Sequence, residues 1–386
     1  MPQLDSPLLL SPVYKPKIWG RSDLSPLFSY PERPRLPRSK ARARSSRAAA
    51  APARAGLPKG HQGAPLIGPL IGEVWITDDT SRFLNGPVAG TTLGEASRQY
   101  GAELLGRSWD HGRFPILAKY LFTTDWLSVQ VHPDDDYAAR HEPGNLGKCE
   151  MWYIVRAARG ARFLLGAKPG VTPSVTKERL RAAAEKGASK ELLRQFRPKA
   201  REAIYVPPGT LHALGPGLVL FEAEQNSDLT YRLDDFGRAG LDGKPRPLHL
   251  DQGFEVARIE QPARRNLPRV TVRESFGARR FVVACRHFAV EELLLRQAAS
   301  FAGSPERVEG LSVFEGDGRV ETSAGWLGYR TGDTWLIPPA TRQYRLVPAE
   351  PTRLFRFYVP DIDRDFRHPL AKRRVPAATV KKVCFE

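Results

Sequence analysis

The sequence is poor in cysteine, with three in 386 residues, and it contains no run of about 18 apolar residues. Cys149, Cys285 and Cys384 are too few and too scattered for a disulfide framework or a thiolate zinc site. The missing apolar run argues against a transmembrane helix. The first twenty residues lack a basic stretch before their apolar residues, which argues against a secretory signal. We therefore expect a cytoplasmic, multi-domain protein that does not insert into membranes.

Acidic residues are outnumbered, 42 against 59 lysines and arginines, which leaves a formal net charge of +17. Residues 31–60 hold nine of these basic residues and a single acid. This stretch has no aromatic residue that could stack on nucleic-acid bases, and it has no hydrophobic periodicity. We expect residues 31–62 to be a disordered Pro/Ala/Arg-rich insertion. A basic arm that binds nucleic acid is the less favoured interpretation.

Apolar runs of four to eight residues, separated by glycine and proline, recur along most of the chain and predict β-strands of a sandwich or barrel. The clearest runs are Ile71–Ile76, Leu127–Val131, Met151–Val155, Arg162–Leu165, Ile204–Val206, Leu218–Phe221, Arg280–Cys285 and Leu354–Val359. Helical patterns occur over Leu93–Leu105 and Lys177–Phe196, and a short helix is expected over Asp134–Arg140. The chain is therefore predicted to be mainly β, with a small helical insertion.

Two short segments of the sequence are similar to each other. Tyr205–His212 reads YVPPGTLH, and Leu336–Gln343 reads LIPPATRQ. The Pro-x-Gly-x-x-His turn of the first copy is similar to the second motif of the cupin barrels, in which the histidine binds a metal. We expect two cupin-like (jelly-roll) β-barrels, of which only the first binds metal, because Gln343 stands where the first copy has His212.

Residues of the types that bind metals gather in the middle of the chain. Gln130 and His132 lie two apart, so on a strand their side chains face the same side. Glu150 begins another apolar strand, and His212 lies in the turn described above. Two imidazoles, a carboxylate and an amide oxygen suit a borderline divalent ion such as Zn²⁺. Each residue alone is as well explained by a structural role, so the prediction depends on their combination.

Longer stretches of the chain resemble the type I phosphomannose isomerases, zinc enzymes of the cupin superfamily, in their short bacterial form. The resemblance covers nearly the whole chain outside the basic stretch, in the segments VYKPKIWG, IGEVWITDD, RFPILAKYLFTTDWLSVQVHPDDDYA, GKCEMWYIV, YVPPGTLHALGPG, SDLTYRLDDFGR and GKPRPLHL. It implies an aldose–ketose isomerase that interconverts mannose 6-phosphate and fructose 6-phosphate through an enediolate, with one Zn²⁺ per chain.

The resemblance also implies roles for individual residues. It places the zinc ligands of the family on Gln130, His132, Glu150 and His212. Arg232 and Lys148 are the expected catalytic cations, and Glu222 is the expected proton-transferring base. Four further residues are expected to bind the substrate: Trp19, Glu73, Lys119 and Ser128.

Three positions depart from the family pattern. The chain has Glu224 where the family often has glutamine, Asp234-Asp235 after the arginine, and Arg201-Glu202 where the family has Gly-Asp. None of these departures removes a ligand. An additional carboxylate at Glu224 or Asp234 is expected to raise a neighbouring pKa or to weaken phosphate binding.

The expected organisation has four parts. Residues 1–30 contribute to the catalytic barrel, 31–62 form the insertion, 63–265 form the metal-binding cupin domain with a helical segment near 176–196, and 266–386 form a cupin-like domain without metal. The expected partner is a small sugar phosphate, and the expected assembly is a monomer or weak homodimer. Three alternatives stay open: a metal-bearing cupin that binds a sugar phosphate without turnover, a nucleic-acid-binding protein, and a cupin isomerase of glucose 6-phosphate.

Overall fold

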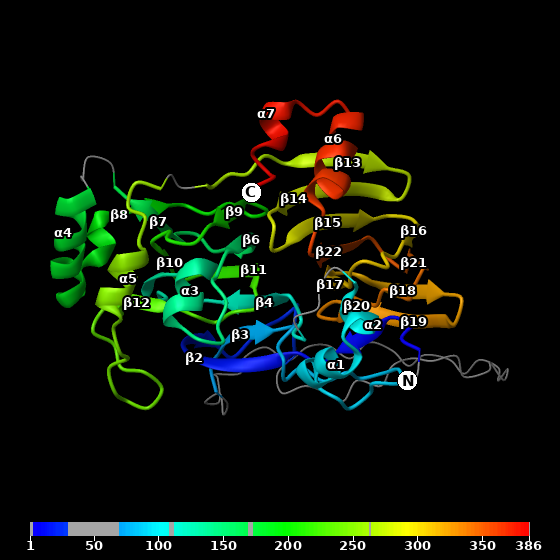
Figure 1. The fold of residues 1–386 in the computed structure, drawn as a ribbon, viewed down its shortest axis with the longest axis horizontal. Helices are drawn as coiled ribbons and strands as arrows, with labels where there is room; N and C mark the ends of the chain where they lie inside the picture. Colours follow the sequence, from blue (N-terminus) through cyan, green and yellow to red (C-terminus); the bar gives the residue numbers. More distant parts are fainter. Residues whose placement is uncertain (1–2, 30–68, 108–111, 169–172, 262–263, 386) are drawn as a thin grey trace, which may run out of the picture.

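Antiparallel β-sheets dominate the chain, in agreement with the predicted mainly β fold (Figure 1). The structure, a computed structural model, describes residues 3–29, 69–107, 112–168, 173–261 and 264–385. The basic insertion predicted over residues 31–62, and with it the suggested nucleic-acid arm, lies outside the described residues. The strands within the described ranges form four sheets.

Two of the sheets pack face to face in the first half of the structure. The six-stranded sheet contains, in spatial order, β2 (Val13–Arg21), β3 (Ile71–Trp75), β4 (Ile116–Phe122), β11 (Leu218–Gln225), β6 (Glu150–Ala157) and β9 (Ala203–Val206). The five-stranded sheet contains β12 (Tyr231–Asp234), β5 (Val129–Val131), β10 (His212–Leu214), β7 (Phe163–Ala167) and β8 (Leu193–Phe196). Side chains from both, among them Trp152, Phe163 and Leu220, form one buried apolar cluster. This burial holds the two sheets together.

The other two sheets repeat this arrangement in the second half. The seven-stranded sheet contains β1 (Leu8–Leu10), β20 (Thr334–Ile337), β17 (Glu309–Glu315), β22 (Thr352–Tyr358), β15 (Ala289–Leu295), β14 (Gly277–Ala284) and β13 (Val270–Glu274). The four-stranded sheet contains β16 (Ala299–Ala302), β21 (Gln343–Pro348), β18 (Asp317–Thr322) and β19 (Gly325–Arg330). Val313, Trp335 and Tyr344 belong to the apolar cluster between them.

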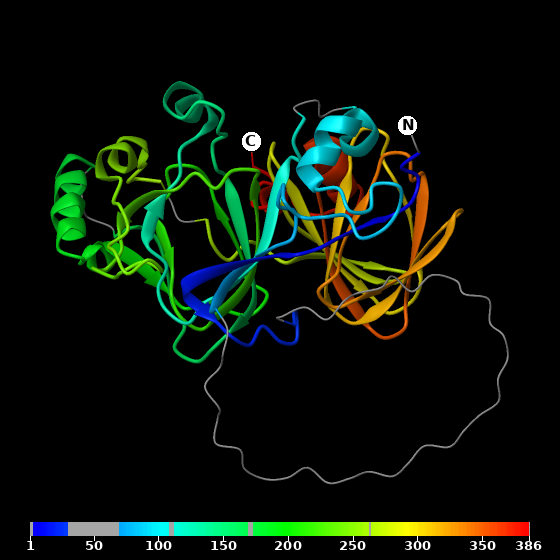
Figure 2. The ribbon, with the colours of Figure 1, turned by 90° about the horizontal axis from the view of Figure 1, so that it is seen from below.

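The two halves lie side by side, and the six-stranded sheet packs on the seven-stranded sheet (Figures 1 and 2). Phe221 of β11 stacks on Phe355 of β22 with ring centroids 4.3 Å apart. The hydroxyl groups of Tyr120 and Ser312 are hydrogen-bonded across the same interface at 2.9 Å. The N-terminal segment joins both halves, since β1 pairs with β20 whereas β2 pairs with β3. The number of barrels and the domain boundaries stay predictions.

The two similar segments found in the sequence each form a turn between two strands. The first copy connects β9 to β10, and the second connects β20 to β21. In each copy the threonine N–H donates to the carbonyl of the first proline, at 3.3 Å for Thr210 and Pro207 and at 3.0 Å for Thr341 and Pro338. Gly209 has φ +82° and leaves no room for a Cβ beside the Arg258 side chain, so this turn requires glycine.

The helices lie at the edges of the sheets. They are α1 (Leu93–Tyr100), α2 (Ala102–Leu105), α3 (Asp135–His141), α4 (Pro173–Glu185), α5 (Leu250–Val256), α6 (His368–Lys372) and α7 (Ala377–Val380), with a 3-10 turn over Ser189–Leu192 and a π-helical turn over Asp363–Arg367. The short helix expected over Asp134–Arg140 is confirmed, because the Asp134 carboxylate caps α3 by accepting from the Tyr137 N–H. Of the helices in the described ranges, none has the length and apolar composition needed to cross a membrane.

The helix expected over Lys177–Phe196 is shorter than its sequence suggests. Gly187 adopts φ +66° shortly after α4, and a left-handed residue does not continue a helix. Leu193–Phe196 then forms β8, which pairs with β7 and buries Leu193 completely. Helix-forming composition is overridden here by the sheet edge that β7 offers.

Candidate active site

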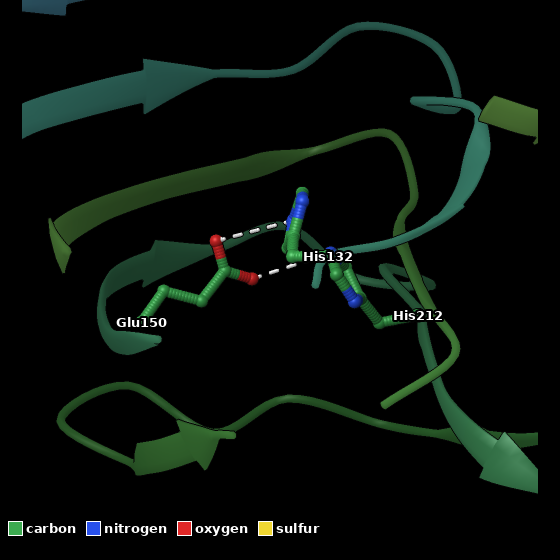
Figure 3. A group of neighbouring side chains, drawn as sticks. All are labelled: His132, Glu150 and His212. Carbon is green, nitrogen blue, oxygen red and sulfur yellow. Dashed lines mark ion pairs between the residues drawn. The ribbon is translucent and has the colours of Figure 1, made fainter. Parts of the chain in front are cut away.

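Three buried side chains converge between the six- and five-stranded sheets. His132 follows β5, Glu150 is the first residue of β6, and His212 is the first residue of β10. One carboxylate oxygen of Glu150 lies 3.2 Å from His212 Nε2, and the other lies 3.6 Å from His132 Nε2 (Figure 3). Gln130 lies opposite His212 in the β5–β10 pair. Strand pairing therefore places Gln130 beside His212, and the packing of the two sheets brings Glu150 to both histidines.

The two histidines direct their Nε2 atoms, which can bind a metal, toward Glu150. The Nδ1 of His132 lies 2.9 Å from the Leu229 carbonyl and that of His212 lies 2.9 Å from the Thr210 carbonyl. A carbonyl only accepts, so Nδ1 carries the proton and Nε2 presents a lone pair. Burial lowers the pKa of both rings, that of His212 to about 4, so both are neutral.

These lone pairs lack a partner among the described side chains. His132 Nε2, His212 Nε2 and one oxygen of Glu150 are buried without a hydrogen bond. Ligand atoms of the three residues lie within 4.8 Å of one another. Lone pairs that face a carboxylate repel it unless a cation lies between them. Imidazole and carboxylate donors in this arrangement fit Zn²⁺, with the Gln130 amide as a further donor.

A cavity of about 200 Å³ opens beside this cluster. It is lined by all the predicted catalytic and substrate-binding residues together with Gln130: Trp19, Glu73, Lys119, Ser128, Lys148, Glu222 and Arg232. The lining residues come from both sheets of the first half, so the cavity lies between them. The structure thus brings every residue selected from the sequence to the metal cluster or to this cavity.

Two lysines and two glutamates form a buried ion-pair network in the cavity wall. Glu222 and Glu224 lie two apart on β11 and face the same side. Glu224 bridges both lysines, at 2.8 Å to Lys119 Nζ and 3.0 Å to Lys148 Nζ. Glu222 lies 3.3 Å from Lys119 Nζ and accepts a hydrogen bond of 2.8 Å from the Trp152 indole. The network fixes the positions of both ammonium groups.

The network separates the pKa values of its two glutamates. Burial opposes ionisation of Glu222, but Lys119 and Lys148 outweigh it and hold the pKa of Glu222 below its ordinary value. Burial dominates for Glu224 and raises its pKa to about 7. Lys119 keeps its proton, because its three nearby glutamates raise its pKa well above the ordinary value despite burial. Glu222 is therefore ionised at neutral pH.

Arg232 has donor groups left over for a ligand. It lies on β12 opposite Gln130 of β5. One Nη donates to the Pro247 carbonyl at 2.9 Å, whereas Nε is buried without a hydrogen bond. A planar guanidinium with unused donors suits an oxyanion.

Sequence reasoning missed four charged or hydroxyl-bearing residues that line the cavity: Lys17, Asp228, Thr230 and Arg246. Alternation could have found Lys17, since it lies two residues before Trp19 on β2. Arg246 is in the GKPRPLHL segment, but nothing in that segment singled it out.

The departures from the family pattern have different locations. Glu224 belongs to the ion-pair network described above, where its carboxylate can influence the pKa values of Lys119 and Lys148. Asp234 is not among the residues that line the cavity, and its effect on phosphate binding stays a prediction. Its carboxylate accepts from the Ser189 N–H at 2.9 Å and from the Phe236 N–H at 2.7 Å, which ties β12 to the segment after α4.

Comparisons with known proteins identify one family of relatives. The family model of the phosphomannose isomerase type I catalytic domain matches residues 67–151. Mannose-6-phosphate isomerase ManA of Bacillus subtilis is 33% identical over 345 residues, which cover 88% of this chain and 95% of the relative. The chain belongs to the mannose-6-phosphate isomerase family. The enzyme of this family from Streptococcus mutans is 34% identical over 279 residues, which cover 71% of this chain and 84% of that enzyme.

Solved structures of mannose-6-phosphate isomerases share the fold. The crystal structure of the Bacillus subtilis enzyme matches with a TM-score of 0.74 and 28% identity, over 91% of this chain and 99% of that one. A zinc-bound mannose 6-phosphate isomerase matches with a TM-score of 0.63 over 92% of this chain, at 16% identity. The predicted family, the predicted enzyme class and the mainly β fold are thereby confirmed.

Proposed function

We propose that this isomerase interconverts mannose 6-phosphate and fructose 6-phosphate with a zinc ion held by Gln130, His132, Glu150 and His212. The observation that carries the proposal is the pair of unpartnered Nε2 atoms facing Glu150 beside the cavity. The names of the relatives support the substrate, and the zinc-bound structure of a mannose 6-phosphate isomerase supports the metal.

The reaction moves a proton between C2 and C1 of the open-chain sugar and passes through an enediolate. Glu222 is the proposed base, since it is ionised and lines the cavity. The Trp152 indole and Lys119 hold its two oxygens, which orients the carboxylate for proton transfer. When bound, zinc supplies Lewis-acid stabilisation of the charge that develops on the sugar oxygens.

The cations of the cavity are proposed to bind and orient the sugar phosphate. Arg232 offers its unused donors to an oxyanion of the substrate. Lys148 lies 3.6 Å from Glu150 and is placed to exchange a proton with the sugar oxygens. Lys119 is a proposed phosphate contact. Trp19, Ser128 and Glu73 complete the wall around the sugar.

Removal and return of the metal test this proposal. The purified full chain is assayed for conversion of mannose 6-phosphate to fructose 6-phosphate before chelation, after chelation and after addition of Zn²⁺. We expect activity to fall at least about 100-fold on chelation and to return with zinc, since metal ions supply several kcal/mol of charge stabilisation. Added Mg²⁺ serves as the control and should not restore activity, because it prefers oxygen ligands. Absence of turnover by zinc-loaded protein would favour the cupin that binds without catalysis, and preferential turnover of glucose 6-phosphate would favour the third alternative.

Glu224→Gln tests the role of the ion-pair network. The substitution preserves the shape of the side chain and removes the charge that bridges Lys119 and Lys148. We expect kcat to fall about tenfold, since buried charge-assisted contacts contribute 1.5–3 kcal/mol. We also expect KM to fall, because two lysines without their shared counterion attract the sugar phosphate more strongly. Steady-state kinetics separate the two parameters. Glu315→Gln removes an exposed carboxylate as the control, and equal kinetics for both variants would contradict a role for Glu224.

A further inference from the structure

The three cysteines, far apart in the sequence, lie near one another in the fold. Cys149 immediately precedes β6, Cys285 immediately follows β14, and Cys384 pairs with Ala284 in a parallel bridge. All three are buried and reduced.

Two of these thiols are neighbours. Cys149 and Cys285 line the same small cavity, and each thiol influences the pKa of the other. The Cys149 thiol also lies 3.1 Å from the Tyr205 hydroxyl. The ring of Tyr205 stacks on Phe385 at 4.1 Å, so the end of the chain covers this contact. The pair therefore connects the start of β6, in the six-stranded sheet, with the end of β14, in the seven-stranded sheet.

A second cavity, of about 240 Å³, gives small molecules a route to the pair. Both cysteines line it, together with Tyr205 and a charged group made of Asp134, Asp135, Asp136, Arg258, Arg286 and His287. It shares no lining residue with the cavity of the isomerase site. Arg258 and Arg286 are more than half exposed and form its mouth, so a polar molecule meets cations on entry.

We propose that Cys149 and Cys285 form an oxidisable dithiol, with a peroxide as its oxidant. The sulfur of Cys285 attacks one oxygen of hydrogen peroxide, the O–O bond breaks, and a sulfenic acid and water result. The sulfur of Cys149 then attacks the Cys285 sulfur, the S–O bond breaks, and a second water leaves. Two thiols lose two electrons and two protons, and one peroxide is reduced to two water molecules. Cys285 is the attacked thiol because hydrogen bonding to its sulfur outweighs burial and holds its pKa below the ordinary value, which favours the thiolate.

Formation of the disulfide displaces the metal-binding strand. Two sulfur atoms that are not bonded must approach each other to reach the bond length of about 2.05 Å. Cys149 directly precedes Glu150, and its backbone is held by Gln225 through N–H and carbonyl hydrogen bonds of 2.9 and 3.1 Å. The strain is therefore transmitted to Glu150, and we expect zinc affinity and activity to fall about tenfold, as for the loss of an outer contact of a metal ligand. This consequence rests on the proposed function, whereas the disulfide itself does not.

Peroxide treatment of the reduced, zinc-loaded full chain tests the proposal. We expect peptide mapping without reductant to find Cys149 linked to Cys285, with the linked peptides lighter by two hydrogen atoms. Thiols titrated after denaturation should fall from three to one per chain. Activity and retained zinc, measured separately, should fall in parallel and recover with dithiothreitol.

Two variants give the test its controls. Cys285→Ser should keep its activity and its zinc under peroxide, whereas Cys384→Ser should behave like the unaltered chain. Retention of all three thiols, or oxidation of single cysteines without a link, would overturn the dithiol. A link that leaves activity and zinc unchanged would overturn its coupling to Glu150. A chain without turnover before oxidation would contradict the proposed function alone, since the mass of the linked peptides does not depend on turnover.

Discussion

Replacement of either His132 or His212 by alanine is expected to abolish isomerase activity together with metal binding. Each ring contributes one unpartnered Nε2 to the cluster, and each is oriented by a backbone carbonyl on its Nδ1. The loss of an outer partner of a ligand already costs 10–100-fold in metal affinity, so loss of the ligand itself should cost at least about 100-fold. Zinc content measured by atomic emission after mild chelation, with activity measured in parallel, checks both effects.

A matched control separates loss of a ligand from general damage. His141 lies exposed on α3, and His141→Ala should retain both zinc and activity. Circular dichroism of the His132 and His212 variants should retain the β signature, because apolar clusters hold the sheets together, and the His212 ring adjoins them through its edge-to-face contact with Trp152 at 5.3 Å. Full zinc occupancy of either variant under chelator challenge would show that the ligand assignment is wrong.

The sequence predicts much of this site because strand alternation is a local property. Gln130 and His132 are two residues apart, and so are Glu222 and Glu224, which places each pair on one face of its strand. The predicted ligand Glu150 can be found from the sequence because it begins an apolar run. These features need only the spacing along a single strand.

The spacing along a single strand does not predict contacts between distant segments. The bridge from Glu224 to Lys119 and Lys148 joins three strands, and only the register of β11 between β4 and β6 brings them together. The same holds for Cys149 and Cys285, which come from different sheets. Such partners are set by packing, which periodicity does not encode.

The repeated turn explains why the second pair of sheets does not copy the metal site. His212 is fully buried, whereas Gln343, at the matching position, is exposed. The next residue, Tyr344, faces the apolar cluster between the sheets instead. Neighbouring residues of a strand face opposite sides, so Gln343 points away from the interior that Tyr344 enters. Its orientation, and not only the replacement of histidine by glutamine, therefore keeps it from acting as a ligand there. The expectation that Gln343 stands in the place of a metal ligand is corrected in this respect.

Ion pairs occupy the corresponding interior of the second half. Arg356 of β22 holds Glu309 of β17 through two hydrogen bonds of 2.9 and 2.6 Å, and Tyr344 donates to the same carboxylate at 3.2 Å. A paired and hydrogen-bonded carboxylate has no need of a metal ion. Within the described residues, the groups of side chains suited to a metal all lie in the first half.

Arg232→Ala is expected to lower kcat by two to three orders of magnitude while zinc binding stays intact. The loss of one preorganised donor to a developing oxyanion costs about 10²–10³ in kcat. Arg232 neighbours Gln130 in register, but its guanidinium donates to the Pro247 carbonyl and does not contact His132 or Glu150. A role in charge stabilisation therefore predicts loss of turnover without loss of metal.

Arg232→Lys provides the discriminating comparison. Lysine keeps the charge but lacks the planar fork, so it should recover only part of the lost kcat if the arginine binds an oxyanion through more than one donor. Arg181→Ala, which removes an exposed arginine on α4, should leave the kinetics unchanged. Steady-state kinetics, with zinc content measured on the same samples, distinguish a role in charge stabilisation from structural support of the metal site. Proportional loss of zinc and activity in Arg232→Ala would make the residue a support of the metal site, because only a structural role couples the two losses.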